Sequence, residues 1–165
     1  MSLPRISTPL FLAAALLSGA AHAQTAAPVA VDGAWARASV PGQKATGAFM
    51  RLTAAQATSL VRAESPAAGV TEVHEMKMDG DVMRMRALPQ GLPLPAGQPV
   101  ALTPGGYHVM LMDLKATLPK DSTIPLTLTF KDAKGVESRV ELKLPVATTA
   151  PGGAAAPAGH AGHKH

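Results

Sequence analysis

The sequence of 165 residues contains no cysteine and few aromatic residues. Without cysteine, the protein has no disulfide, no thiolate metal ligand and no thiol nucleophile. A blue-copper electron-transfer site is also excluded, because it needs a cysteine thiolate beside two histidines. Aromatic residues make up 3% of the chain, and the basic residues behind its net charge of +4 are scattered. We therefore do not expect a nucleic-acid surface with stacking rings.

The N-terminal apolar run is too short to span a membrane. It covers Leu10 to Leu17, whereas a spanning helix needs roughly 20 residues. Arg5 precedes the run and Ala21-His22-Ala23 follows it, which is the pattern of a signal peptide with a small-residue cleavage site. We expect residues 1–23 to be removed near Ala23, leaving an exported protein with no stable membrane insertion.

Both ends of the mature chain differ in composition from its middle. Residues 24–33 form a short lead, and residues 147–165 form a tail rich in Ala, Gly and Pro. Such a tail cannot bury a core. The tail also holds His160, His163 and His165. We therefore expect one domain over residues 34–146, which is long enough to bury a hydrophobic core.

The middle of the chain is typical of an all-β domain. Short runs with strand-like composition are separated by turn residues such as Pro41-Gly42, Asp79-Gly80 and Pro104-Gly105-Gly106. Regular spacing of this kind predicts a β-sandwich or barrel. The predicted strands are 34–38, 48–53, 60–63, 71–78, 82–88, 100–102, 108–114, 124–130 and 138–144.

Sulfur is concentrated in the segment VHEMKMDGDVMRMR, residues 73–86. Asp-Gly between strand-like residues predicts a hairpin with a two-residue turn. With Asp79-Gly80 as that turn, Met76 lies opposite Met83 and His74 lies opposite Met85. Directly opposed side chains are about 4.5–5.5 Å apart at Cβ, so the imidazole and the thioether could bind one ion.

A second pair of the same kind follows in the segment GYHVMLMDL. His108 and Met110 are two residues apart, so they share one face of a strand. Thioether and imidazole ligands without a thiolate favour Cu(I) over zinc, calcium or magnesium. Packing is the competing interpretation, because methionine commonly fills gaps in cores. The spacing alone does not decide between Cu(I) binding and core packing.

These residues resemble the signature of the periplasmic copper chaperones called PCu(A)C. That signature is a His, ten residues, a Met, twenty-one or twenty-two residues, and His-x-Met. Here His74 is followed by ten residues and Met85, then by twenty-two residues and His108-Val109-Met110. The words VHEM, VMRMR and PGGYHVMLM are also similar to the family, and the resemblance runs from about Trp35 to Leu144.

The resemblance implies a cupredoxin-like Greek-key β-barrel or sandwich that binds one Cu(I) through His74, Met85, His108 and Met110. It also implies delivery of copper in the periplasm to the CuA subunit of cytochrome c oxidase or to another copper protein. The alternative is copper storage or resistance without a dedicated oxidase acceptor. We expect a monomer, with a copper-bridged dimer as the alternative.

The histidine-rich end of the tail has two interpretations. His160, His163 and His165 could capture Cu(II), for which imidazole is a suitable ligand, or they could simply be solvated. No nucleophile elbow, zinc-protease motif, phosphate loop or dinucleotide fingerprint is present, so we do not expect an enzyme. An export-compartment binding module, in which Met and His only pack, remains the other alternative.

Overall fold

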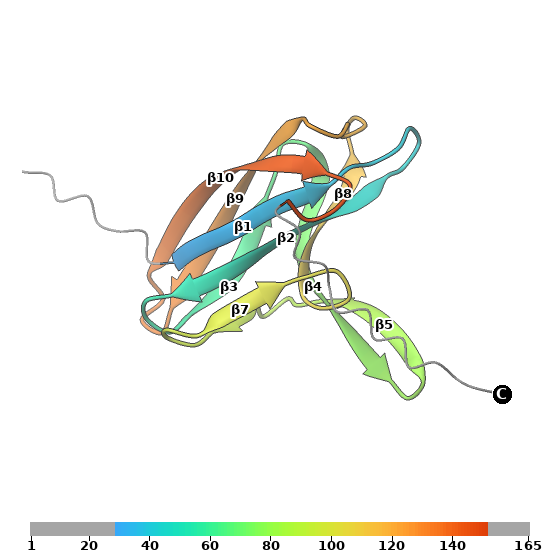
Figure 1. Cartoon of the computed structure of the whole chain (residues 1–165). Helices are drawn as coiled ribbons and strands as arrows, with labels where there is room; N and C mark the ends of the chain where they lie inside the picture. Colours follow the sequence, from blue (N-terminus) through green and yellow to red (C-terminus); the bar gives the residue numbers. More distant parts are fainter. Residues whose placement is uncertain (1–28, 152–165) are drawn as a thin grey trace, which may run out of the picture.

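The computed structural model describes residues 29–151, and these residues form ten β-strands and no helix (Figure 1). No segment of this described part is a helix that could cross a membrane. The strands are β1 (Val29–Arg37), β2 (Ala45–Ala54), β3 (Thr58–Glu64), β4 (Ala68–Asp79), β5 (Val82–Ala87), β6 (Leu92–Leu94), β7 (Pro99–Leu102), β8 (His108–Leu114), β9 (Thr123–Asp132) and β10 (Glu137–Ala147). The all-β prediction is confirmed.

The strands form one open sheet with β5 and β6 at its ends. Their order is β5-β4-β8-β2-β1-β10-β9-β3-β6, and β7 pairs with β2 beside this path. β1 pairs with β10 in parallel, whereas the other strand pairs of the described residues are antiparallel. The parallel pair joins two halves that face each other, as Figure 1 shows. The sheet therefore encloses a core between β8-β2-β1 and β10-β9-β3.

The core is filled by the alternate residues of these strands. A strand places successive side chains on opposite faces, and the inward positions are aliphatic or aromatic. Complete burial of a Leu or Phe side chain contributes about 1.5–3 kcal/mol. The largest fully buried side chains are Phe130, Leu52, Leu60, Leu94, Leu102, Leu111, Leu126, Leu128, Leu144, Val29, Val109 and Val146.

Two features of the strand pattern differ from the sequence prediction. β1 begins at Val29, inside the segment 24–33 that was expected to precede the domain. β6, residues Leu92–Leu94, was not predicted because it is short and contains Pro93. Proline lacks the N–H donor of a central strand but is tolerated at an edge. β6 is such an edge, since it pairs only with β3.

The register of the β4–β5 hairpin also differs from the prediction. His74 lies opposite Ala87, Met76 opposite Met85, and Met78 opposite Met83, so the predicted pairs His74–Met85 and Met76–Met83 are wrong. The turn is Gly80-Asp81, one residue later than predicted. Gly80 has a φ of 62°, and glycine at the first central position is typical of a type II′ turn.

The hairpin leaves the body of the molecule at His74. β4 pairs with β8 from Ala68 to His74, whereas the rest of β4 pairs with β5 alone. Figure 1 shows the resulting two-stranded ribbon projecting from the sheet. The base of this ribbon is therefore where the side chains of β4, β5 and β8 can meet.

Candidate metal centre

The two histidines are directly opposite each other on neighbouring strands. His74 of β4 pairs with His108 of β8, and their ring centroids are 5.9 Å apart. Their sequence neighbours Val73 and Val109 point into the core, so both imidazoles lie on the outer face of the sheet. Even there they are 8% and 6% exposed, respectively. The pairing therefore creates a buried pair of imidazoles at the base of the hairpin.

The His108 ring is oriented by a backbone carbonyl. Its Nδ1 lies 3.0 Å from the carbonyl oxygen of Gly106. A carbonyl oxygen only accepts hydrogen bonds, so Nδ1 carries the proton and donates it. In the neutral ring, Nε2 then presents a lone pair, and Nε2 is 3.2 Å from the Met85 sulfur. The same Gly106 oxygen also accepts a hydrogen bond from Met76 N, which ties this loop to β4.

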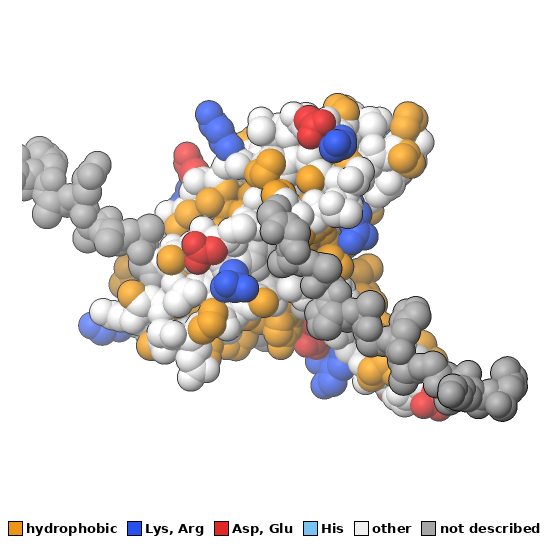
Figure 2. All heavy atoms as spheres, viewed as in Figure 1, with side chains coloured by type: hydrophobic (Ala, Val, Ile, Leu, Met, Phe, Trp, Pro, Cys, Tyr) orange, Lys and Arg blue, Asp and Glu red, His pale blue; other side chains and the backbone are white. Residues whose placement is uncertain are grey.

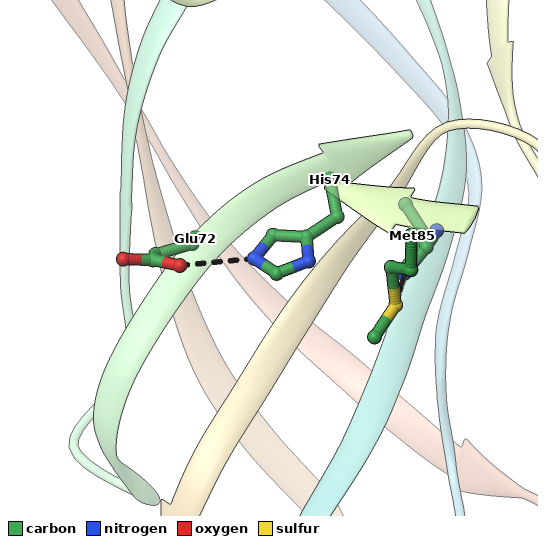
Figure 3. Close-up of polar contacts among 4 residues, drawn as sticks. Glu72, His74 and Met85 are labelled. Atoms are coloured by element: carbon green, nitrogen blue, oxygen red, sulfur yellow. Dashed lines mark hydrogen bonds and ion pairs between the residues drawn. The ribbon is translucent and has the colours of Figure 1, made fainter. Parts of the chain in front are cut away.

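The His74 ring leaves one buried nitrogen without a partner. Its Nε2 donates to the Glu72 carboxylate at 2.9 Å, whereas its Nδ1 is buried and has no hydrogen-bond partner in the structure. Figure 3 shows the ring between Glu72 and Met85, with the unbonded nitrogen on the side of Met85. A buried polar atom without a partner costs about 1–3 kcal/mol. A bound metal ion would satisfy this lone pair.

The methionines line a cleft beside the histidines. The cleft has a volume of about 300 Å³, and its lining includes Met76, Met85, His108 and Met110. Met110 lies opposite Glu72 on β4 and shares the outer face with His108. Met85 is 49% exposed, so its flexible thioether is open to solvent from the side of the hairpin. The cleft therefore brings together soft sulfur atoms and one imidazole.

Aromatic rings support the site from β2 and β1. Phe49 lies on the outer face with its ring centroid 6.5 Å from that of His108, and it contacts Trp35 at a centroid distance of 4.9 Å. Gly47 makes room for this ring, because a Cβ on Gly47 would lie 2.8 Å from Phe49 Cζ. The small residue at 47, opposite Met110, therefore fixes Phe49 beside the histidines.

The composition of the site limits which metals it suits. The described residues contain no group of three His, Asp or Glu side chains that could hold an ion. A zinc or calcium centre normally needs such a group when cysteine is absent. Thioether sulfur combined with imidazole nitrogen is instead a soft pair of donor types, which favours Cu(I).

The sequence prediction named the four candidate ligands but not the residues that position them. His74, Met85, His108 and Met110 lie around the hairpin base, although Met85 is diagonal to His74 rather than opposite it. The roles of Glu72, Phe49, Gly47 and Gly106 were not foreseen. Only Glu72 had a local signal, because it precedes His74 by two residues and so shares its face. The tail residues His160, His163 and His165 lie outside the described residues.

The chain belongs to the LpqE-like family. Residues 29–146 match the family described as "Putative lipoprotein LpqE-like". "Putative lipoprotein Lxx21020" of Leifsonia xyli subsp. xyli (strain CTCB07) is 34% identical over 115 residues, which cover 70% of this chain and 69% of the relative. Both descriptions name lipoproteins, a class of exported protein.

Solved structures share the fold. The copper-bound PCuAC domain from PmoF2 has a TM-score of 0.58 and 21% identity, over 76% of this chain and 97% of that domain. The solution structure of CuI-DR1885 from Deinococcus radiodurans has a TM-score of 0.56 and 29% identity, over 78% and 83% of the two chains. Its apo form has a TM-score of 0.52 and 31% identity, over 88% and 95%. The predicted cupredoxin-like fold is therefore confirmed.

Proposed function

We propose that the protein is a periplasmic copper chaperone that binds one Cu(I) through His74, Met85, His108 and Met110 and passes it to another protein. One observation carries the proposal: His108 Nε2 and the Met85 sulfur are in contact at 3.2 Å. A second supports it, because His74 Nδ1 is buried without a partner. Nitrogen and sulfur ligands of one first-row metal ion can be at most roughly 4.3 Å apart. The observed contact is within this limit.

Each of the two histidines makes a hydrogen bond through the ring nitrogen that would not bind the metal. Gly106 fixes the proton of His108 on Nδ1, and Glu72 accepts the proton of His74 on Nε2. In each case a hydrogen bond at one ring nitrogen leaves a lone pair on the other, as is usual for metal-binding histidines. In the neutral form, each imidazole therefore directs a lone pair away from its hydrogen-bond partner, where a cation can bind.

The mixture of buried and exposed ligands suits a carrier. The imidazoles are buried, whereas Met85 is half exposed on a projecting ribbon. Because a thioether is neutral, its displacement by a ligand of an acceptor leaves no buried charge behind. Copper can then leave by ligand exchange, one sulfur at a time, with no redox step in the domain. We propose this transport role in place of catalysis.

The proposed acceptor of the copper is the CuA subunit of cytochrome c oxidase. The solved Cu(I) form of DR1885 supports copper binding by this fold; the acceptor rests on the resemblance to PCu(A)C proteins. We propose that the protein is exported and acts as a monomer. We also propose that His160, His163 and His165 capture Cu(II), for which imidazole is a suitable ligand.

The binding test is an anaerobic Cu(I) titration of the mature chain against a chromophoric chelator. We expect tight binding of one Cu(I), and we expect His74→Ala, His108→Ala and Met85→Leu each to weaken it at least about tenfold, or about 1.4 kcal/mol. Met112→Leu is the matched control, because Met112 is half buried on β8 outside the proposed ligand set. Unchanged affinity in the three ligand variants would rule out this site.

The delivery test uses the same loaded protein and the apo form of an oxidase CuA subunit. Copper content is measured in each protein after anaerobic mixing and separation. We expect copper in the acceptor when the donor is wild type, and also when His160, His163 and His165 are all changed to Ala. Retention of copper on the donor in both cases would favour storage over delivery.

A further inference from the structure

The outer half of the β4–β5 hairpin presents methionines that the proposed copper centre does not use. Met78 and Met83 are directly opposite each other, and they are 54% and 51% exposed. Met76 comes next along the same face, opposite Met85. Because alternate residues of a strand share a face, these side chains form a continuous methionine ladder, which we define as Met76, Met78, Met83 and Met85.

Packing does not explain the outer part of this ladder. A methionine that fills a core is buried, whereas Met78 and Met83 are more than half exposed. The ribbon that carries them projects from the body, and Figure 2 shows hydrophobic side chains at its surface beside Lys and Arg. Within residues 29–151, the part of β4 beyond His74 pairs with β5 alone. The sulfur atoms are therefore accessible to a ligand from solution.

The opposite face of the ribbon is occupied by ion pairs. Arg84 Nε is 2.8 Å from the Asp79 carboxylate, and Arg86 pairs with Glu75. Residues 75–86 contain three acidic and three basic side chains, so the ribbon has no net charge to repel a cation. The hairpin thus separates a charged face from a face of neutral thioethers.

We propose that Met76, Met78 and Met83 form a second, weaker Cu(I) site on this hairpin. Side chains that oppose each other directly are about 4.5–5.5 Å apart at Cβ. The unbranched methionine side chain has three rotatable bonds, so the sulfurs of Met78 and Met83 can converge on one ion. Three soft thioethers without an imidazole or a carboxylate select Cu(I) above the harder cations. Copper binds there without any change in its oxidation state.

This inference extends the proposed function, because the second site adjoins the first. Met85 lies opposite Met76 and contacts His108, so the ladder leads from the exposed turn to the buried histidines. The absence of an imidazole from the outer site means that it should fill after the inner one. The two sites can nevertheless be tested separately, because Met78 and Met83 are not among the proposed ligands of the inner site.

The test follows the methionine methyl resonances of the full mature chain by NMR during anaerobic addition of up to three equivalents of Cu(I). We expect Met85 and Met110 to shift with the first equivalent, and Met78 and Met83 to shift later. The double variant Met78→Leu with Met83→Leu should keep the first event and lose the second. The control Met112→Leu should keep both.

A further variant distinguishes failure of the second site from failure of the proposed function. In His74→Ala with His108→Ala, Met78 and Met83 should still shift, since the outer site contains no histidine. Resonances of Met78 and Met83 that stay unmoved in the wild type throughout the titration would overturn the second site, whatever Met85 and Met110 do. Shifts of Met78 and Met83 without any shift of Met85 and Met110 would overturn the inner site and keep the outer one.

Discussion

The replacement of His74 by leucine separates copper binding from folding. In the apo protein, His74 Nδ1 is buried without a partner, and its removal relieves a cost of about 1–3 kcal/mol. The bond from Nε2 to Glu72 is also lost, but the Glu72 side chain is 46% exposed and can be solvated. Because His74 is buried and Glu72 is half exposed, we take the net contribution of this hydrogen bond as about 0.5–1.5 kcal/mol.

The steric cost of His74→Leu should be small. Volume-conserving changes in packed sites usually cost less than about 1.5 kcal/mol. Taken at their midpoints, these terms nearly cancel, so we expect the stability of the apo variant to lie within about 1 kcal/mol of the wild type. His108→Leu should behave differently, because it loses the hydrogen bond that Nδ1 donates to the Gly106 carbonyl. We expect it to be destabilised by about 0.5–1.5 kcal/mol.

The assay is urea unfolding of the apo proteins, followed by the fluorescence of Trp35. Excess Cu(I) should then separate the variants further, because a ligand at 100 times its dissociation constant stabilises the folded state by about 2.7 kcal/mol. The wild type should gain this stability, and both histidine variants should lose most of it. If apo His74→Leu is less stable than the wild type by more than about 2 kcal/mol, then His74 is held for structure and the reasoning is refuted.

Two further substitutions test the support of the site. Glu72→Ala should weaken Cu(I) binding by about 10–100-fold, because it removes the hydrogen-bond partner of a ligating histidine, and Glu72→Gln should weaken binding less. Competition with a chelator measures both affinities. Equal affinity in the wild type and both variants would contradict the orienting role of Glu72. Gly47→Ala places a Cβ 2.8 Å from Phe49 Cζ, so we expect a loss of about 1–3 kcal/mol in thermal unfolding, with recovery in the double variant that adds Phe49→Leu. No recovery would show that the strain lies elsewhere.

The sequence was sufficient to predict the fold class and the shared face of the candidate ligands. Turn residues and alternating strands identified most of the strands, and the two-residue spacing of His108 and Met110 placed them on one face. The hairpin register was wrong because Asp79-Gly80 and Gly80-Asp81 are both plausible two-residue turns. Moving the turn by one residue shifts each partner by two positions, so His74 and Met85 stay on the same face and become diagonal neighbours.

The remaining features depend on contacts between distant parts of the chain. The pairing of His74 with His108 requires β8 to lie beside β4, and no local sequence pattern predicts that these two strands are neighbours. The carbonyl of Gly106 acts on His108 only because of the loop conformation between β7 and β8. Phe49 reaches the histidines from β2 because Gly47 lacks a Cβ. Each of these contacts is a property of the assembled sheet.

X-ray absorption at the copper edge of the mature chain, loaded with one equivalent of Cu(I), tests the central claim most directly. The claim is that β4, β5 and β8 gather imidazole and thioether ligands around a single monovalent ion. The account predicts sulfur and nitrogen scatterers on the same copper, with sulfur lost in part in Met85→Leu and Met110→Leu. A copper bound by nitrogen alone, with a spectrum unchanged by either substitution, would contradict it.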